Sequence, residues 1–118
     1  MSWTVLYHDD FVPELEALDE SVQDELLTCV SVLEAVGPTL GRPRADTPAG
    51  SKHANMKELR FRADGGVWRA AFAFDPARRA IVLVAGDKAG VAQTRFYKGL
   101  IVKADKRFAD HLKSIKDI

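Results

Sequence analysis

The amino-acid sequence predicts an α+β domain in which helices pack against a mainly antiparallel sheet. Two amphipathic segments fill most of the first 36 residues, three strand-like segments separated by turn residues follow, and a last amphipathic segment lies near the C-terminus. A chain of 118 residues is long enough to bury one hydrophobic core. We therefore expect a single domain over residues 1–118. Its predicted order is a short N-terminal strand, two helices, an antiparallel meander and a C-terminal helix.

The N-terminal part is expected to begin with a short strand over residues 3–7, which are rich in aromatic and β-branched side chains. Asp9 or Asp10 can cap the helix that follows. Apolar residues then recur at helical spacing among acidic residues, which places a first helix over about residues 10–19.

A second helix is expected from near Ser21 to a stop at Gly37-Pro38. Residues 37–55 are too rich in Gly, Pro and Ser for a regular element, so they predict a long loop. Such a loop can contact a phosphate backbone or can be a solvated mobile segment. Its candidate contact residues are Arg42, Arg44, Lys52 and His53.

A β-meander is predicted over residues 56–62, 67–74 and 80–86, with turns at Asp64-Gly65-Gly66 and Asp75-Pro76. Side chains alternate between the two faces of a strand. If Leu59, Phe61, Trp68 and Phe72 face the core, the opposite face therefore carries the guanidinium groups of Arg60, Arg62 and Arg69.

Three further expectations concern the edges of this sheet. Lys57 has the wrong parity for the arginine face and joins it only if it lies just before the regular strand. The apolar run 81–85 reads as buried on both faces and therefore central, which leaves Lys88 on a flexible rim. A basic amphipathic helix is expected around residues 104–115, with Phe96-Tyr97-Lys98 preceding it.

The charges are strongly separated along the chain. All 17 Lys and Arg residues lie after position 41, whereas residues 1–36 hold nine Asp and Glu residues and no Lys or Arg. The zero net charge is thus a cancellation of −9 in the first 36 residues against +9 in the rest. This separation suggests a cationic working face opposite an acidic back, with a polyanion as the partner.

Several classes of protein and site find no support in the sequence. The first residues contain neither a cationic leader nor a long apolar run, so we expect a cytoplasmic protein without a membrane span. The three histidines are far apart, and no P-loop or serine-hydrolase motif is present, so we expect no metal and no cofactor. Cys29 lies in a helical run without electropositive neighbours and is expected to be buried and unreactive.

The remaining chemistry is that of Arg, Lys and Tyr. These residues suit cleavage of RNA by transesterification, in which the 2′-hydroxyl of the substrate attacks its own adjacent phosphate. The protein then needs only to orient the phosphate, neutralise its charge and move protons. The alternative is that the three arginines merely solubilise an exposed sheet face.

Seven short fragments occur together in one order between residues 53 and 112. They are His53–Arg60, Trp68-Arg69, Phe72–Pro76, Gly86–Gly90, Phe96-Tyr97, Ala104-Asp105 and His111-Leu112. In order and spacing they resemble the phage-derived HigB subgroup of the RelE-like toxins. The resemblance implies a RelE-like fold and an mRNA endonuclease that usually acts on the ribosome without a metal and inhibits translation. It also implies a helix-turn-helix, HigA-like antitoxin encoded beside the toxin.

The resemblance also implies site residues. Arg69 and Lys88 match the family's phosphate-stabilising cations, Tyr97 its aromatic hydroxyl, and Lys57 and Arg60 its basic residues entering the sheet. We expect these five to be catalytic and, in addition, Arg62, Arg95 and Lys98 to bind substrate.

The chain departs from the subgroup pattern before the last helix, where Val102 stands in place of the common Pro. His111 also matches a subgroup position, but its spacing with Phe108 and Leu112 favours a structural hydrogen bond. Two other readings stay open. One is a non-catalytic regulator of the same fold that binds RNA or a protein, and the other is an interaction surface on the acidic helices.

Overall fold

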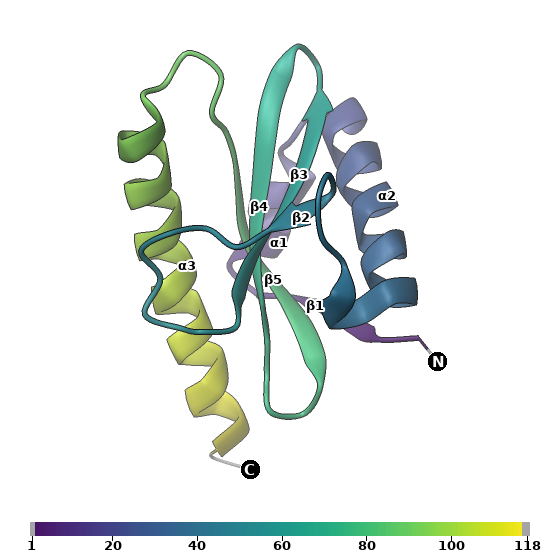
Figure 1. Cartoon of the computed structure of the whole chain (residues 1–118), viewed down its shortest axis with the longest axis vertical. Coiled ribbons are helices and arrows are strands. Elements are labelled where there is room, and N and C mark those ends of the chain that lie inside the picture. The colour runs from purple at the N-terminus through teal and green to yellow at the C-terminus, as the bar shows by residue number, and fades with distance from the viewer. Residues whose placement is uncertain (1, 117–118) are drawn as a thin grey trace.

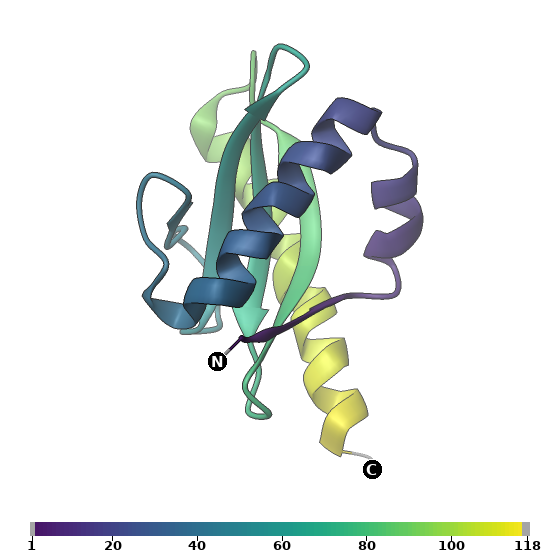
Figure 2. The same cartoon turned by 90° about the vertical axis from the view of Figure 1, so that its right-hand side faces the viewer.

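The computed structural model describes residues 2–116 and contains one five-stranded sheet in the order β1-β5-β4-β3-β2. Helices α1 and α2 cover one face of the sheet, and α3 covers the other (Figures 1 and 2). The elements in chain order are β1 (Thr4–Tyr7), α1 (Phe11–Glu16), α2 (Glu20–Val36), the 3-10 helix η1 (Gly37–Thr39), β2 (Ala45–Asp46), β3 (Met56–Ala63), β4 (Gly66–Phe74), β5 (Arg79–Asp87) and α3 (Gln93–Lys116). The predicted α+β class is confirmed.

The two N-terminal helices follow the predicted order with shifted boundaries. α1 ends at Glu16 rather than near residue 19, because Asp19 serves as the N-cap of the next helix. The Asp19 carboxylate accepts a hydrogen bond from the backbone N–H of Ser21 at 3.1 Å. Asp10 occupies the N-cap position of α1, but its side chain makes no capping bond. α2 ends at Val36, and Gly37 is its C-cap, which agrees with the predicted stop at Gly37-Pro38; the φ of +71° at Gly37 is accessible to glycine.

The meander lies within one residue of its predicted bounds. β3 and β4 are joined by Asp64 and Gly65, whose φ angles of +50° and +73° have the sign that a two-residue type I′ turn requires. β5 lies between β4 and the parallel strand β1, so the predicted central position is confirmed. The expectation of a loop without regular structure over residues 37–55 is wrong at two short points. η1 follows α2 directly, and Ala45 and Asp46 pair with β3 as an added edge strand.

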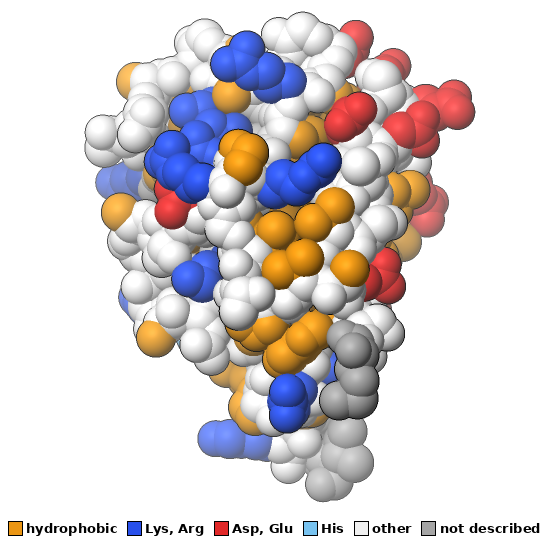
Figure 3. Space-filling view, turned by 45° about the vertical axis from the view of Figure 1, so that its right-hand side comes forward, with side chains coloured by type: hydrophobic (Ala, Val, Ile, Leu, Met, Phe, Trp, Pro, Cys, Tyr) orange, Lys and Arg blue, Asp and Glu red, His pale blue; other side chains and the backbone are white. Residues whose placement is uncertain are grey.

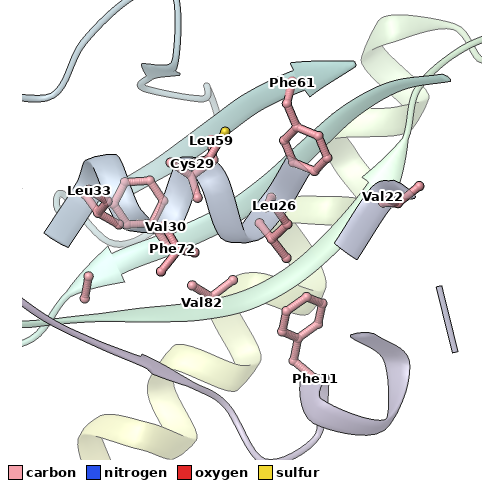
Figure 4. Packing of buried hydrophobic residues seen from close by; sticks show 12 residues of the cluster. Phe11, Val22, Leu26, Cys29, Val30, Leu33, Leu59, Phe61, Phe72 and Val82 are labelled. Atoms are coloured by element: carbon pink, nitrogen blue, oxygen red, sulfur yellow. The ribbon is translucent and has the colours of Figure 1, made fainter. Parts of the chain in front are cut away.

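The face of the sheet beneath α1 and α2, here called the back face, is joined to these helices by apolar contacts. Leu26 of α2 and Phe11 of α1 are fully buried and lie over Val82 and Phe72 of the sheet (Figure 4). Removing such a side chain from water stabilises the fold by about 1.5–3 kcal/mol each. The back face therefore supplies a continuous hydrophobic core.

The opposite face, here called the front face, is covered by α3. Phe96, Leu100, Ala104 and Phe108 follow one another at intervals of four along α3, and they pack on sheet residues that include Met56, Ala71, Ala73, Ile81 and Leu83. A β-bulge between Ala71 and Phe72 shifts the pairing with β5, so that Leu83 and its neighbour Val84 both join this second core.

Two expectations about this face are therefore wrong. α3 begins at Gln93, so Phe96, Tyr97 and Lys98 lie within the helix and do not precede it. The arginine face is also not open, because α3 packs over the sheet. The parity prediction itself is confirmed: Arg60 pairs directly with Arg69 across β3 and β4, and Arg62 lies two residues along from Arg60. None of the helices in residues 2–116 is long and apolar enough to cross a membrane.

Candidate functional site

A groove with a volume of about 1150 Å³ lies between α3 and the segment that follows β2. Residues 46–53 form one wall, the exposed side of α3 forms the other, and the middle of β3 lies at the bottom. Glu58 and Arg60 of β3 and Tyr97 of α3 line the groove together. The groove therefore brings together Glu58 and Tyr97, which are 39 positions apart in the sequence.

A buried cluster of Glu58, Arg69 and Tyr97 adjoins the bottom of the groove: Glu58 and Tyr97 line the groove, whereas Arg69 lies outside its lining. The side chains of Glu58 and Arg69 are only 3% and 6% exposed, and their charged groups lie 3.9 Å apart. The Tyr97 hydroxyl lies between them: it donates to Glu58 Oε1 at 2.7 Å and accepts from Arg69 Nε at 3.2 Å. Burying charges is unfavourable unless they are paired and hydrogen-bonded, as they are here.

Tyr97 has a pKa raised above its usual value of 10.0, first because it is buried and then because it donates a hydrogen bond to the Glu58 carboxylate. Its O–H group therefore stays protonated near neutral pH and acts as a donor. A phenol of this kind can take up a proton only if it passes its own proton to Glu58 at the same time.

Arg69 has one nitrogen free for a ligand. Nη1 donates to the carbonyl oxygen of Trp68 at 2.9 Å, and Nε is engaged by Tyr97. Nη2 makes no hydrogen bond. Every fully buried side-chain nitrogen and oxygen of the described residues has a hydrogen-bond partner, so Nη2 is not fully buried. Nη2 is thus the part of the guanidinium that keeps contact with solvent.

Arg60 links this buried cluster to the surface. Its Nη1 lies 3.3 Å from Glu58 Oε2 and 3.5 Å from Asp46 Oδ2. Asp46 in turn pairs with the exposed Arg42 at 2.8 Å. A hydrogen bond from the Thr47 N–H, followed by that from Arg42, lowers the pKa of Asp46 below its usual value. One connected network thus joins Arg42 and Arg60 in the groove, and Arg69 beside it, through the carboxylates of Asp46 and Glu58.

Gly86 of β5 helps to seat the first turns of α3. A Cβ atom at this position would come within 3.0 Å of the Phe96 ring. Because glycine has no Cβ, the ring packs closely against β5, and the next residue of α3 is Tyr97. The close approach of helix and strand positions the hydroxyl of Tyr97 between Glu58 and Arg69.

The structure places the other predicted site residues differently with respect to the groove. Lys98 lines the groove, whereas Arg62, Lys88 and Arg95 lie outside its lining. Arg62 and Arg95 are exposed and Lys88 is half-buried. None of these four cations belongs to an ion pair within the described part of the chain.

Lys57 stands apart from the cluster. It has the parity of Leu59 and therefore faces the back of the sheet, in agreement with the parity assigned from the sequence. Its amine donates to Thr47 Oγ1 at 2.7 Å, and the side chain does not line the groove.

The candidate contact residues of the loop 37–55 lie on two different sides of the sheet. Arg42 and Lys52 line the groove, and so does His53, whose ring packs edge-on against Phe108 at 4.9 Å. Arg44 points the other way, with Nη1 4.0 Å from the Cys29 sulfur. The expectation that Cys29 lacks an electropositive neighbour is therefore wrong. Burial still raises the pKa of this thiol, and the expected buried cysteine is confirmed.

Sequence reasoning missed the carboxylates of the site. The parity that Glu58 shares with Arg60 and Arg62 did place it on the arginine face. It did not indicate that Glu58 is buried, because an acidic residue on a polar face is ordinarily exposed. Asp105 was not singled out either. Its carboxylate accepts hydrogen bonds from Ser51 Oγ at 2.6 Å and from the Lys52 N–H at 2.9 Å, and so ties one wall of the groove to the other.

Elsewhere the structural role expected for His111 is confirmed, because its Nε2 lies 2.8 Å from Asp75 Oδ2. The charge separation is visible on the surface: in Figure 3, Lys and Arg side chains gather mainly at the upper left, with some acidic surface among them, and most of the Asp and Glu in view lie along the right-hand edge. Within residues 2–116, no three His, Cys, Asp or Glu side chains gather in a way that could hold a metal ion.

Comparison with known proteins gives three findings. The model of the family described as phage-derived protein Gp49-like matches residues 13–109. Two Mycobacterium tuberculosis proteins named as toxins are similar over 87% of this chain: HigB2 is 47% identical over 104 residues, and HigB3 is 43% identical over 107 residues. The matched part is 51% of HigB2, so the chain spans about half the length of that relative, but it is 91% of HigB3.

The third finding is a similar solved structure, a double mutant of the Escherichia coli toxin RelE in its free state. It matches with a TM-score of 0.63 over 87% of this chain and 97% of that chain. The sequence identity is 13%, so this similarity shows the fold alone.

Proposed function

This chain belongs to the phage-derived Gp49-like family, in which it is similar to HigB-type toxins of toxin-antitoxin systems, and on that premise we propose that it is an mRNA endonuclease. Cleavage of mRNA would inhibit translation and arrest growth. The observation that carries the proposal is the buried cluster of Glu58, Arg69 and Tyr97, in which Glu58 and Tyr97 line the groove together with Arg60 and hold Arg69 next to it.

The cluster supports cleavage by transesterification. The 2′-oxygen of one nucleotide forms a bond to the adjacent phosphorus, and the bond from phosphorus to the 5′-oxygen of the next nucleotide breaks. In our proposal Arg69 Nη2 and Arg60 bind the nonbridging oxygens, whose negative charge increases in the transition state. The products are a 2′,3′-cyclic phosphate and a free 5′-hydroxyl.

The proton of the 2′-hydroxyl needs an acceptor. The hydrogen bond of 2.7 Å from Tyr97 to Glu58 supports a relay in which Tyr97 takes this proton and passes its own to the carboxylate. The leaving 5′-oxygen takes up a proton from water, and the hydroxide that remains is neutralised by the proton that Glu58 then releases. Lys88, Arg62, Arg95 and Lys98 then extend the cationic surface that attracts the RNA backbone.

We further propose that the toxin acts in the cytoplasm on mRNA held by the ribosome, and that a helix-turn-helix antitoxin of the HigA type neutralises it. Family membership supports these assignments. The separation of acidic helices from a cationic groove also supports them, since it leaves a basic surface for RNA on one side and an acidic surface on the other.

The experiment is induced expression of the wild type and of Arg69→Lys in bacterial cells that lack the antitoxin, with growth followed and mRNA 5′ ends mapped. Lysine keeps the charge but lacks the planar fork, so we expect cleavage to fall by about 10²–10³-fold. New 5′ ends that keep the reading frame would indicate cleavage on the ribosome. The matched control is Arg78→Lys, since Arg78 is exposed and lies over Trp3, away from the groove.

Undiminished cleavage by Arg69→Lys would contradict the proposed role of Arg69. Intact mRNA with folded wild-type protein would favour a second candidate, a non-catalytic regulator that binds RNA or a protein. One observation favours that candidate: Arg69 is 5% exposed and already held by Tyr97 and a backbone carbonyl.

A further inference from the structure

The groove extends well beyond the Glu58, Arg69 and Tyr97 cluster. Tyr97 and Lys106 both line it, and nine residues of helix separate them by about 13 Å along α3. Its volume of about 1150 Å³ also exceeds the range of roughly 300–1000 Å³ that is usual for small-molecule sites. A single phosphate and its two flanking oxygens fill only one end. The other end, here called the outer groove, is lined by Pro48, Ala49, Lys52, Val102 and Lys106.

The outer groove has an apolar wall that faces solvent. Val102 is 65% exposed, more than any other large apolar side chain of the described residues. It lines the groove together with Ile101 of α3 and with Pro48 and Ala49 of the opposite segment. An exposed apolar surface inside a groove is typical of a ligand site, and a flat ligand can lie against it without a hydrogen-bond partner.

Cations flank this apolar wall. Lys98 and Lys106 lie four residues before and after Val102, and therefore on the same side of α3. Lys52 lines the opposite wall. All three lysines are exposed, and none forms an ion pair with another described residue. Apolar surface between unpaired cations fits a nucleotide, which has an apolar base face and an anionic phosphate.

The outer groove is also held in shape without a ligand. The hydrogen bonds from Ser51 and the Lys52 N–H to Asp105 fasten residues 51–52 to α3, and they occupy both oxygens of that carboxylate. Asp105 is the acidic residue nearest to Lys106 in the sequence, and its oxygens are directed at this link. The two walls thus stand ready at a fixed separation, which lowers the entropy lost on binding.

We propose that the outer groove is a subsite for an unpaired nucleotide that flanks the cleaved phosphate, with its base against Val102 and Pro48 and its phosphate near Lys106 and Lys52. This inference rests on the proposed function, since it extends the same RNA strand beyond the cluster. A base can lie against the wall only when it is not paired, so the subsite selects single-stranded RNA. Contact with a base face rather than a base edge makes the selection tolerant of sequence.

The test measures binding separately from cleavage. Its probes are 2′-O-methyl RNA oligonucleotides, which lack the attacking hydroxyl and so cannot be cut by this reaction. Lengths of about three and about nine nucleotides bracket the smaller sites of single-strand-binding grooves. Affinities are measured by fluorescence anisotropy for the wild type, Val102→Asn, Val102→Phe and Lys106→Glu. Lys103→Glu is the matched control, because Lys103 is an exposed lysine of α3 that does not line the groove.

We expect the wild type to bind the long oligonucleotide more tightly than the short one. For the long oligonucleotide, Val102→Asn and Lys106→Glu should each weaken binding about tenfold, and Val102→Phe should tighten it severalfold through stacking. Binding of the short one should change less than threefold in every variant. Loss of one phosphate contact should also reduce the slope of log affinity against log salt by about 0.7. In Lys103→Glu, the ratio of the affinities for the long and the short oligonucleotide should equal that of the wild type.

Affinities of Val102→Asn and Lys106→Glu equal to that of the wild type would overturn the subsite. So would equal binding of short and long oligonucleotides by the wild type. A loss of antitoxin binding in these variants, with RNA binding unchanged, would assign the outer groove to the protein partner instead. Cleavage is assayed separately with wild-type protein and mRNA in a translating extract. Absence of cleavage together with length-dependent binding would overturn the proposed endonuclease while supporting the subsite.

Discussion

The two faces of the sheet are joined to their helices in different ways. On the back face, α1 and α2 meet the sheet through a continuous set of buried apolar side chains. On the front face, α3 makes apolar contacts at Phe108 and Ala104, but near its beginning it covers two buried charged residues, Glu58 and Arg69. A buried ion pair is seldom more stabilising than apolar residues of the same volume. The back face is thus built for stability, and in our proposal the charged part of the front face is kept for the cleavage of RNA.

The largest expected effect is a loss of stability when the core of the back face is altered. Leu26→Ala should lower the free energy of unfolding by about 2–5 kcal/mol, because Leu26 is fully buried between the helices and the sheet. Cleavage per folded molecule should stay unchanged. Urea unfolding followed by circular dichroism measures the first quantity. A loss below about 1 kcal/mol would show that the back face repacks around the cavity.

A smaller effect on stability and a larger effect on activity are expected for Glu58→Gln. The amide keeps an acceptor for Tyr97 but removes the charge that faces Arg69 and Arg60, which should cost about 1–3 kcal/mol of stability. Cleavage should fall by about tenfold or more if the carboxylate receives the proton. The measurements are urea unfolding and the cleavage rate at a protein concentration corrected for the folded fraction.

The control for this substitution is Glu34→Gln, an equal change of charge at an exposed position of α2. It should alter neither quantity. If Glu58→Gln lowers stability but cleaves RNA as fast as wild type, the buried carboxylate is structural, and the contrast between the two faces disappears.

The next effect depends on pH and concerns the attachment of α3 at its other end. Burial alone would raise the pKa of Asp75, but hydrogen bonds from His111 and Arg79 outweigh it and hold this pKa below its usual value. The folded pKa thus lies below the unfolded value of about 3.9. The native state then binds fewer protons than the unfolded state, so this stabilisation is complete above that pH and is lost as the pH falls through the folded pKa.

The corresponding measurement is urea unfolding of the wild type and of Asp75→Asn between neutral pH and about pH 3. The wild type should be the more stable protein at neutral pH, and the difference between the two should shrink below about pH 4. A difference that stays constant across this range would show that the Asp75 carboxylate does not titrate with folding.

The smallest effect is expected for Lys57→Ala. Lys57 faces the back of the sheet and does not line the groove, although it donates to Thr47 in the groove wall. Its replacement should therefore change stability by less than about 0.5 kcal/mol and cleavage by less than about twofold. Arg60→Ala on the same strand is the informative partner, because Arg60 lines the groove and contacts Glu58. Equal losses of cleavage in the two variants would contradict the assignment of Lys57 to the back face and Arg60 to the front face, because that assignment rests on strand parity.

Much of this contrast could be predicted from the sequence. The alternation in Met56–Ala63 and Gly66–Phe74, together with the turn at Asp64-Gly65, was sufficient to place Arg60 and Arg69 on the same face. These signals are local, because strand parity and turn type depend on neighbouring residues. The fragments quoted for the toxin resemblance also led to the family that the comparisons show.

The covering of the front face could not be predicted in the same way. Gly99 interrupts the helical pattern of α3, and the apolar partners of that helix lie on a face that the arginines made appear solvent-exposed. The burial of Glu58 depends on Tyr97, 39 positions away, and the bulge beside Ala71 depends on strand pairing. Such features arise from tertiary contacts, which composition and periodicity do not encode directly.

The position of Tyr97 on the last helix has a consequence for the synthesis of the protein. Glu58 and Arg69 lie on the meander, but the hydroxyl that joins them belongs to α3, which begins at Gln93. A nascent chain that has released only its helices and meander from the ribosome therefore holds an incomplete cluster. The proposed toxin would be harmless to the ribosome that makes it until α3 has emerged and docked on the sheet. If the proposed function holds, the order of the elements would give the cell a short interval in which the antitoxin could bind before the first cleavage.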